Sequence, residues 1–531
     1  MRYCDRTGYY DKKARKGILP IRLGLVACIL AAAPSNIVHA EKLLARNDTA
    51  KEQSAPPVVA RYLNTDGHFA NISKPENGDK EPAETFAELD EKKKWKGTKV
   101  CFGQWNGYGM VYRVLDSLTT DYSGGDENVR TMLLDCDVSL YKLPYMEDKG
   151  AEPLWEDSLV RAWLNGEEFL YNDSCFTEPE RAAIISSVKA EPLESESKDV
   201  SVTRYNFGPI HYRYLQFTPL TGDRIFLLDS KELSNAEYGY HPAPTGIEYT
   251  DICYTNRRKA LYEDGYYSYS SYWVRTNLVE NTVQDITSEY YAPVYCNQYA
   301  NFCTGSVNNG MGKGVSPAMN LDVSHILFTA SDEQEHVYLT LTNGSAVTRA
   351  DAEPEDLSVD AGGGYVGLRN IALEGEYEIA PEGLWAMVAD ADGGVYSYER
   401  IPDAVEGESF VRIGEGLDPG DYRLYVFYAA EGFPTSYACM DLDERFDLKV
   451  ERGDSGTPYY TYVVKEGDSL WRIAERFCDS FFVKEDENGN PDKTLCEYVT
   501  YLWESNRDVV TDPDHIEPGM ELRLFRVSPS F

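Results

Sequence analysis

The C-terminal part of the chain has a clear change of hydrophobic period. Tyr462 and Val464 alternate with polar residues, as in a half-buried strand, and a Gly-Asp turn follows. The next apolar residues recur at the spacing of one helix face, and they are Leu470, Ile473, Ala474 and Phe477. Asp468 is placed to cap the first turn of this helix. The pattern therefore predicts a strand followed by an amphipathic helix.

A second helix and a closing strand follow. Thr494 and Glu497 have capping-box spacing, which predicts that a helix begins there, and we expect it to end near Asn506. Leu522 and Leu524 then share one face of a short strand. The predicted order is strand, helix, helix, strand.

These residues, in this order, resemble the LysM family. The matching positions are Tyr462, Val464, Gly467, Asp468, Ser469, Leu470, Ile473, Ala474, Asn506, Ile516, Pro518, Gly519, Leu522 and Leu524. The resemblance implies a βααβ domain over residues 459–527 that binds an N-acetylglucosamine polymer of the peptidoglycan or chitin type. It needs no cofactor and no general acid.

The resemblance also implies a sugar groove between two loops. The residues that carry over are Gly467, Asp468, Ser469 and Leu470 in the first loop, and Asp512, Pro513, Asp514, His515 and Ile516 in the second. Such a groove offers backbone hydrogen bonds and apolar surface to acetamido sugars. The segment between the two helices is longer than in the family. Cys478 and Cys496 bracket it and would form a disulfide if their Cα atoms approach within about 7 Å.

The first 40 residues read as a signal peptide. Basic residues precede a short apolar run, and a small-residue motif ending at Ala40 fits a cleavage site. An alternative is a lipoprotein acylated at Cys28. The run is too short for a permanent membrane span, so we expect no integral span in the mature chain.

The middle of the chain is divided by composition. Residues 41–98 are polar and weakly periodic, which predicts a disordered linker. Residues 99–331 predict an α+β domain with short strands and two helices. One helix starts near Trp155 and ends at Asn165, and the other is capped by Thr177 with Glu180 three residues on.

Motifs in this α+β region resemble an uncharacterised domain family of exported bacterial proteins. They are a Phe-Gly-Xxx-Tyr/Trp start, a Trp-Xxx-Xxx-Ser-Xxx-Xxx-Arg-Xxx-Trp-Leu-Asn-Gly helix, a Trp-Leu-Arg-Ser motif and a Gly-Val-Arg-Pro-Ala close. Thr276 replaces the expected Ser, and Ser316 replaces the expected Arg. The alternation of short helices and loop-bearing strands is similar to the C-type-lectin fold, which says nothing about activity.

Residues 332–451 change to short strands separated by regular Gly and Asp turns. This spacing predicts a β-sandwich of the Ig-like type, a spacer or protein-contact module. Residues 452–458 then form a linker to the LysM region. We therefore expect a multidomain α+β protein.

Composition narrows the function. The chain has 88 acidic and 51 basic residues, a net charge of −37, which disfavours binding to nucleic acid. The seven histidines are scattered without metal-ligand spacing, so no metal site is predicted. In the central region, Cys296 and Cys303 are close enough in sequence to form a local disulfide rather than a catalytic pair.

The sequence predicts a secreted, non-catalytic protein of the cell envelope, held on the cell wall by LysM. Its central domain would meet an unknown protein or glycan partner. Two alternatives stay open. One is a wall-targeted enzyme with an active site in the central domain, and the other is a surface adhesin.

Overall fold

The computed structural model describes residues 58–76, 94–147, 153–190, 202–204, 208–210, 215–240, 255, 258–261, 267–281, 289–296, 302–304, 312–353, 357–361, 363–402, 408–413, 417–452, 459–481 and 491–525. The predicted signal peptide, with Cys28 and Ala40, lies outside these residues. The described chain is mostly β with few helices.

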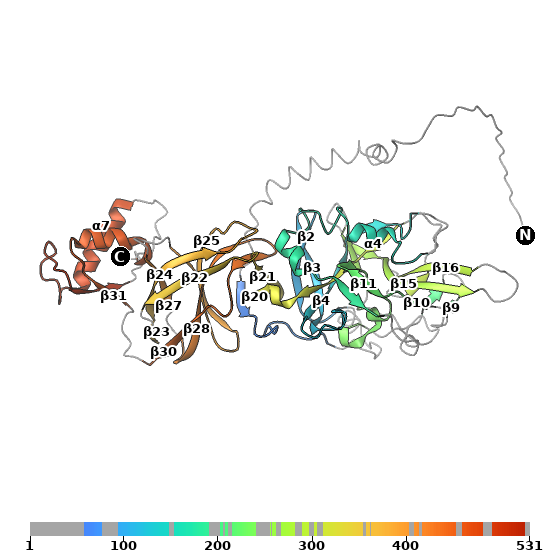
Figure 1. Ribbon diagram of the computed structural model, residues 1–531, viewed down its shortest axis with the longest axis horizontal. Coiled ribbons are helices and arrows are strands. Elements are labelled where there is room, and N and C mark those ends of the chain that lie inside the picture. Colours follow the sequence, from blue (N-terminus) through green and yellow to red (C-terminus); the bar gives the residue numbers. More distant parts are fainter. Residues whose placement is uncertain are drawn as a thin grey trace, which may run out of the picture. The chain divides into compact units, whose positions relative to one another are not determined.

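One large sheet runs through most of the described chain (Figure 1). Its strands in spatial order are β12 (Ile225–Phe226), β19 (Ala318–Asp322), β4 (Thr131–Cys136), β3 (Tyr108–Thr119), β2 (Lys99–Trp105), β21 (His336–Thr342), β29 (Ser436–Cys439), β28 (Gly420–Ala430), β25 (Gly383–Ala389) and β26 (Val395–Ile401). Four further strands branch from this path, and they are β1 (Val58–Leu63), β20 (Ile326–Asp332), β23 (Leu357–Asp360) and β30 (Phe446–Glu451).

Smaller sheets complete the central region. The largest contains β6 (Tyr141–Leu143), β18 (Lys313–Val315), β15 (Tyr272–Asn281), β16 (Glu289–Cys296), β17 (Phe302–Thr304), β8 (Val202–Arg204), β9 (Gly208–Ile210) and β10 (Leu215–Phe217). In the others, β11 (Leu220–Asp223) pairs with β7 (Ser187–Lys189), and β13 (Arg258–Leu261) lies between β14 (Tyr267–Ser270) and β5 (Val138–Ser139).

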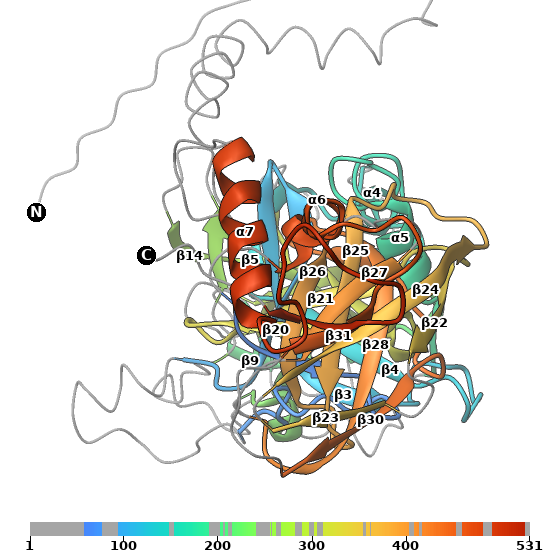
Figure 2. The same cartoon turned by 90° about the vertical axis from the view of Figure 1, so that its left-hand side faces the viewer.

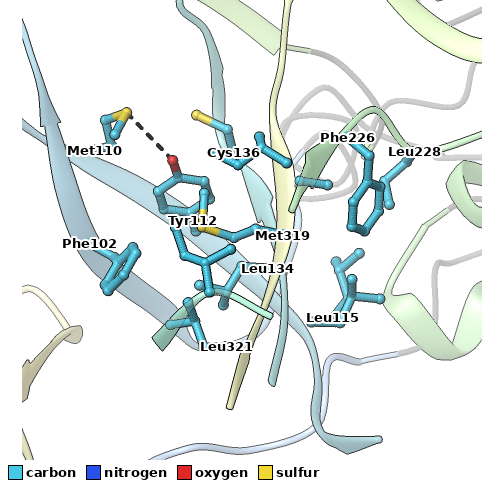
Figure 3. Close-up of a cluster of buried hydrophobic side chains, with 14 of the residues drawn as sticks. Phe102, Met110, Tyr112, Leu115, Leu134, Cys136, Phe226, Leu228, Met319 and Leu321 are labelled. Carbon is cyan, nitrogen blue, oxygen red and sulfur yellow. Dashed lines mark hydrogen bonds between the residues drawn. The ribbon is translucent and has the colours of Figure 1, made fainter. Parts of the chain in front are cut away.

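The core of the central region lies on β2, β3, β4 and β19. Val100 and Phe102 of β2 are fully buried, and Cys101 between them is also buried, so both faces of this strand are covered. Figure 3 shows Phe102, Tyr112 and Met319 among the side chains of this core. The Tyr112 hydroxyl donates to the Met110 sulfur at 3.5 Å, so this buried polar atom has a partner.

Two short helices flank this core. Helix α4 (Leu159–Leu164) begins after the N-cap Ser158, four residues later than Trp155. Helix α5 (Glu178–Ala183) has the predicted capping box between Thr177 and Glu180, which is confirmed.

The segment predicted as a linker is ordered in part. Strand β1 pairs with β20, from Val58 opposite Asp332 to Leu63 opposite Phe328. Leu63 is 2% exposed, and Trp95 is also buried, with its indole N–H donating to the Tyr238 carbonyl at 2.8 Å. The linker prediction is therefore wrong for these residues. The hydrophobic pattern of the segment did not predict these ordered residues, because only single apolar side chains of the segment enter the core.

The predicted boundary between residues 331 and 332 falls inside the large sheet. β20 and β21 form an antiparallel pair across it. The other edge of β21 is parallel to β2 at residues 336–338 and to β29 at residues 340–342. Backbone hydrogen bonds therefore continue from the central region into the region predicted as a sandwich.

That second region has two packed sheets. A three-stranded sheet of β22 (Val347–Glu353), β24 (Gly364–Glu374) and β27 (Glu408–Ile413) lies against strands of the large sheet. Leu368 from β24 and Leu424 from β28 are fully buried in the shared core. The Ig-like and lectin-like assignments stay predictions.

Candidate functional site

The C-terminal part has the predicted βααβ order. It consists of β31 (Tyr459–Val463), α6 (Leu470–Phe481), α7 (Pro491–Ser505) and β32 (Glu521–Phe525), with α6, α7 and β31 visible together in Figure 2. The two strands are antiparallel, with Tyr462 opposite Leu522. Ile473, Ala474 and Phe477 of α6 are fully buried, as their spacing predicted.

The two predicted groove loops leave the same end of this two-stranded sheet. Beyond the last register pair, the Val464 N–H donates to the Met520 carbonyl, and the Gly519 N–H donates to the Val464 carbonyl, both at 2.8 Å. The first loop begins three residues after Val464, and the second ends three residues before Gly519. The strand pairing therefore brings together two loops that are far apart in sequence.

Asp468 serves the fold and not the helix cap. Its carboxylate accepts the Tyr462 hydroxyl at 2.6 Å and the Lys465 N–H at 2.8 Å, and forms an ion pair with Arg476 at 3.2 Å. Burial raises the pKa of this carboxyl, but these partners outweigh it and lower the pKa. The side chain is only 5% exposed. The cap is Ser469, whose hydroxyl accepts the Arg472 N–H at 3.2 Å. The predicted cap is therefore one residue too early.

The other loop residues divide by exposure. Leu470 is 2% exposed and Ile516 is partly buried, and both pack in the core of this domain. The exposed members are Gly467, Ser469, Asp512, Pro513, Asp514 and His515. These six are the positions that a ligand can reach.

The second loop is shaped by its own backbone. The Asp512 carboxylate accepts the Asp514 N–H at 3.1 Å, and the Asp512 carbonyl accepts the His515 N–H at 3.0 Å. The His515 imidazole lies 3.4 Å from the Glu517 carboxylate, with both side chains mostly exposed. The loop is therefore a formed turn that presents polar groups to solvent.

Sequence reasoning missed one exposed side chain beside the first loop. Trp471 follows Leu470 in the first turn of α6 and is 47% exposed. The signal was available, because a Trp lies outside the apolar face defined by Leu470 and Ile473.

The second helix begins earlier than predicted. Helix α7 starts at Pro491, so Thr494 lies inside it and is not its cap. Proline suits a first helical position, because its missing N–H would have no partner there. Cys478 is buried and Cys496 is exposed. Their disulfide stays a prediction, and the segment 482–490 between them lies outside the described residues.

Asn506 connects the end of α7 to the closing strand. This fully buried amide donates to the Leu502 carbonyl at 2.8 Å and to the Arg523 carbonyl at 2.9 Å, and accepts the Arg523 N–H at 2.7 Å. Its match to the LysM pattern is therefore explained by folding.

The domain also packs on the neighbouring sheet. The Phe410 ring of β27 lies 4.6 Å from the Tyr460 ring and 5.2 Å from the Phe477 ring, both edge to face. Tyr365 of β24 joins the same cluster. Through these aromatic contacts the C-terminal domain packs against the sandwich region.

In the central region, side chains of the helix motif at residues 155–166 bind the segment at residues 223–225. The Trp155 indole N–H donates to Asp223 at 3.3 Å, and Arg161 forms an ion pair with the same carboxylate. The Asn165 amide donates to the Ile225 carbonyl at 2.7 Å and accepts the N–H groups of Arg224 and Ile225 at 3.1 Å. These side chains fix α4 to the strands β11 and β12.

The central region also contains a buried charge cluster. Arg275 is 2% exposed and lies 3.2 Å from Glu232 and 3.4 Å from Asp229, while Lys189 lies 2.7 Å from Glu232. Burial and the nearby Glu232 charge raise the pKa of Asp229 to about 6. Burial opposes ionisation of Glu232, but Lys189 and Arg275 outweigh it and lower the pKa of Glu232 to about 2. Arg275 also donates to the Leu227 carbonyl at 3.0 Å.

The two departures from the family pattern are also buried. The Thr276 hydroxyl lies 2.9 Å from the Ser230 hydroxyl and accepts the Ser230 N–H at 2.8 Å. The Ser316 hydroxyl donates to the Cys136 carbonyl at 2.9 Å. Both substitutes are therefore hydrogen-bonded within the core.

The disulfide between Cys296 and Cys303 stays a prediction. Strand register places Cys296 opposite Phe302 and Cys303 opposite Tyr295, so the two cysteines are one register step apart.

Comparison with known families gives two matches. Residues 462–525 match the LysM domain, and residues 128–323 match a domain of unknown function (DUF6273). No curated protein matches the chain. The chain therefore contains a LysM domain and a central DUF6273 domain.

No group of three His, Cys, Asp or Glu side chains in the described ranges could hold a metal ion. No helix in the described part of the chain is long and apolar enough to cross a membrane.

Proposed function

We propose that this chain is a secreted, non-catalytic protein of the cell envelope, which its LysM domain attaches to N-acetylglucosamine-containing glycan of the peptidoglycan type. The central DUF6273 domain is the part that meets a partner. The observation that carries the proposal is the convergence of two exposed loops at one end of the LysM sheet.

The geometry of the loops supports binding to a neutral sugar. The carboxylate of Asp468 is occupied by Tyr462, Lys465 and Arg476, so it is unsuited to act as an acid or base. The exposed residues that remain are Gly467, Ser469, Pro513 and the turn that contains Asp512, Asp514 and His515. Such a surface offers hydrogen-bond donors and acceptors, and its two carboxylates accept from sugar hydroxyl and amide groups while repelling anionic ligands.

The central domain's chemistry supports a non-catalytic role. Its buried carboxylates Asp229 and Glu232 are engaged by Arg275 and Lys189. Burial raises the pKa of the thiol of Cys136 to about 12, so this buried side chain does not supply a thiolate at neutral pH.

The attachment is tested by a substitution in the first loop of the full-length protein. Gly467 has a φ of 86° and open space where a Cβ would point, so Gly467→Gln places a side chain at the groove loop without a clash. We expect at least a tenfold loss of affinity for purified peptidoglycan in a sedimentation assay.

Gly125→Gln is the matched control. Gly125 is also exposed, with a φ of 97° and open space around it, but it lies in the central domain. Both substitutions place a non-glycine residue at a positive φ, which costs a similar free energy of about 1 kcal/mol. A difference in binding between them therefore reports where the new side chain lies. Equal binding by the two variants would overturn the LysM assignment of the groove.

The enzyme alternative has its own measurement. Full-length protein is incubated with intact cell walls and with soluble wall fragments, and the supernatant is analysed by mass spectrometry. We expect no released or shortened fragments. Release that depends on the protein would replace the non-catalytic proposal with the wall-targeted enzyme. If the protein is an adhesin, the wild type and Gly467→Gln would bind cells equally well.

A further inference from the structure

Four aromatic side chains gather on the central domain, away from the LysM loops. Trp105 and Tyr108 are register partners across the β2–β3 turn, so they share one face of this hairpin. Asn106 and Gly107 between them have φ values of 53° and 79°, which fit a tight two-residue hairpin turn. Tyr141 of β6 and Trp163 of α4 join them, and we call these four residues the aromatic platform.

The rings of the platform form an ordered stack. Trp163 lies between the rings of Phe169, at 5.0 Å and 20°, and Tyr141, at 5.6 Å and 9°. Trp105 stands edge-on to Trp163 at 5.5 Å and 73°. Phe169 is fully buried, whereas Tyr141 is 50% exposed. The stack therefore starts in the core and ends on a ring at the surface.

The support beneath the platform is rigid. Trp163 belongs to α4, which Asn165 attaches to the Ile225 carbonyl at 2.7 Å. Of the two tryptophans in the helix motif, Trp155 is buried and bonded to Asp223, while Trp163 is only partly buried. Folding accounts fully for Trp155, whereas part of Trp163 and about half of the Tyr108 and Tyr141 side chains face solvent.

The ligand chemistry follows from shape and charge. A fixed aromatic ring at a surface takes a ligand with a flat apolar face and polar edges, which is the character of a pyranose ring. Glu167 and Glu168, which follow Trp163 closely in the chain, are exposed, and the net charge is −37. This charge repels anionic ligands such as nucleic acid, whereas sugar hydroxyls can donate to carboxylates.

We propose that the aromatic platform is a second saccharide site, at which a neutral N-acetylated hexosamine of a glycan chain stacks on Tyr141. The choice of sugar rests on the proposed function, because the LysM ligand is a polymer that repeats the same unit. A polymer can occupy both sites of one chain. Linking two weak sites raises the retention of the protein on glycan without a new contact at either site.

The test uses full-length protein and a soluble hexamer of β-1,4-linked N-acetylglucosamine, measured by isothermal titration calorimetry. Tyr141→Ala removes the outer ring, and Gly467→Gln blocks the LysM loop. Tyr377→Ala is the control, because Tyr377 is 48% exposed and lies between β24 and β25 of the sandwich region. We expect two sites per chain in wild type and in the control, one in each single variant, and none in the double variant.

The two proposals fail in different ways. Loss of all binding in Gly467→Gln with unchanged binding in Tyr141→Ala would overturn the platform and keep the LysM site. Unchanged binding in Gly467→Gln with loss of all binding in Tyr141→Ala would overturn the LysM site and keep the platform. Should Tyr141→Ala fail to fold by circular dichroism, Tyr141→Leu gives the same test, since it removes the ring and keeps an apolar side chain against Trp163. A change in sedimentation velocity without a change in sugar binding would assign the surface to a second copy of the chain and overturn the proposal.

Discussion

The central domain and the LysM domain have different interiors. In the central domain, Arg275, Glu232 and Asp229 lie inside with almost no exposure. The core of the LysM domain is apolar and aromatic, with Ile473 and Phe477 fully buried. The described part of the LysM domain has one largely buried ion pair, between Arg476 and Asp468 beside the first loop, whereas the central domain encloses Arg275 together with two carboxylates.

The difference follows from how each backbone is satisfied. Short strands and long connections in the central domain leave carbonyl groups, such as those of Leu227 and Ile225, that side chains must satisfy. Arg275 and Asn165 supply these donors. The LysM domain satisfies most of its backbone through two helices and one strand pair, and needs one buried amide, Asn506. Buried polar residues in this protein are therefore explained by the irregular backbone that they satisfy, without a catalytic role.

The strongest test of this comparison is Arg275→Met. The substitution leaves Asp229 and Glu232 with less opposing charge in a buried site, and it removes the donor to Leu227. We expect a loss of about 3–5 kcal/mol in the free energy of unfolding of the central domain. Differential scanning calorimetry of the full-length protein measures it.

The control is Arg507→Met, in the LysM domain. Its ion pair with Glu504 is 3.4 Å long and mostly exposed, so we expect a change below about 1 kcal/mol. Similar losses for the two variants would contradict the claim that the central charges are structural.

A second test addresses the single buried amide of the LysM domain. Asn506→Ala removes three hydrogen bonds and leaves backbone groups of Leu502 and Arg523 without these partners. We expect a loss of about 2 kcal/mol in the unfolding free energy of this domain. Faster hydrogen exchange at the amides of β32 reports it, with β3 as the internal reference. Unchanged exchange in β32 would show that the amide is dispensable.

The smallest expected effect is a pH dependence of the central domain. Asp229 has a folded pKa of about 6, above its unfolded value near 4, so the folded state binds more protons between these values. Stability contributed by this group is therefore present below pH 4 and lost as the pH rises to 6. Asp229→Asn should flatten this decline by on the order of 1 kcal/mol.

Urea unfolding at pH 4, 5 and 6 measures the decline. Glu237→Gln serves as the control, because Glu237 is exposed and its substitution makes the same change in charge. A decline that persists unchanged in Asp229→Asn would assign the pH dependence to other groups.

Local sequence patterns were sufficient to predict an element whose own residues carry its spacing or its cap. The amphipathic spacing of α6 and the capping box of α5 were both correct. Helix starts were less certain, because Ser469 and Pro491 compete with nearby residues for the first turn. Strand β1 was missed because it is stabilised by its pairing with β20, more than 260 positions away in the chain.

The candidate sites show the same division. By itself, the sequence determined the LysM domain and its two loops, because a short βααβ unit leaves few alternatives for its pattern. Only the tertiary structure decided that Asp468 is engaged by Tyr462 and Arg476, and that Tyr141 stacks on Trp163. These contacts join residues on different elements, and no local period in the chain encodes how separate elements meet.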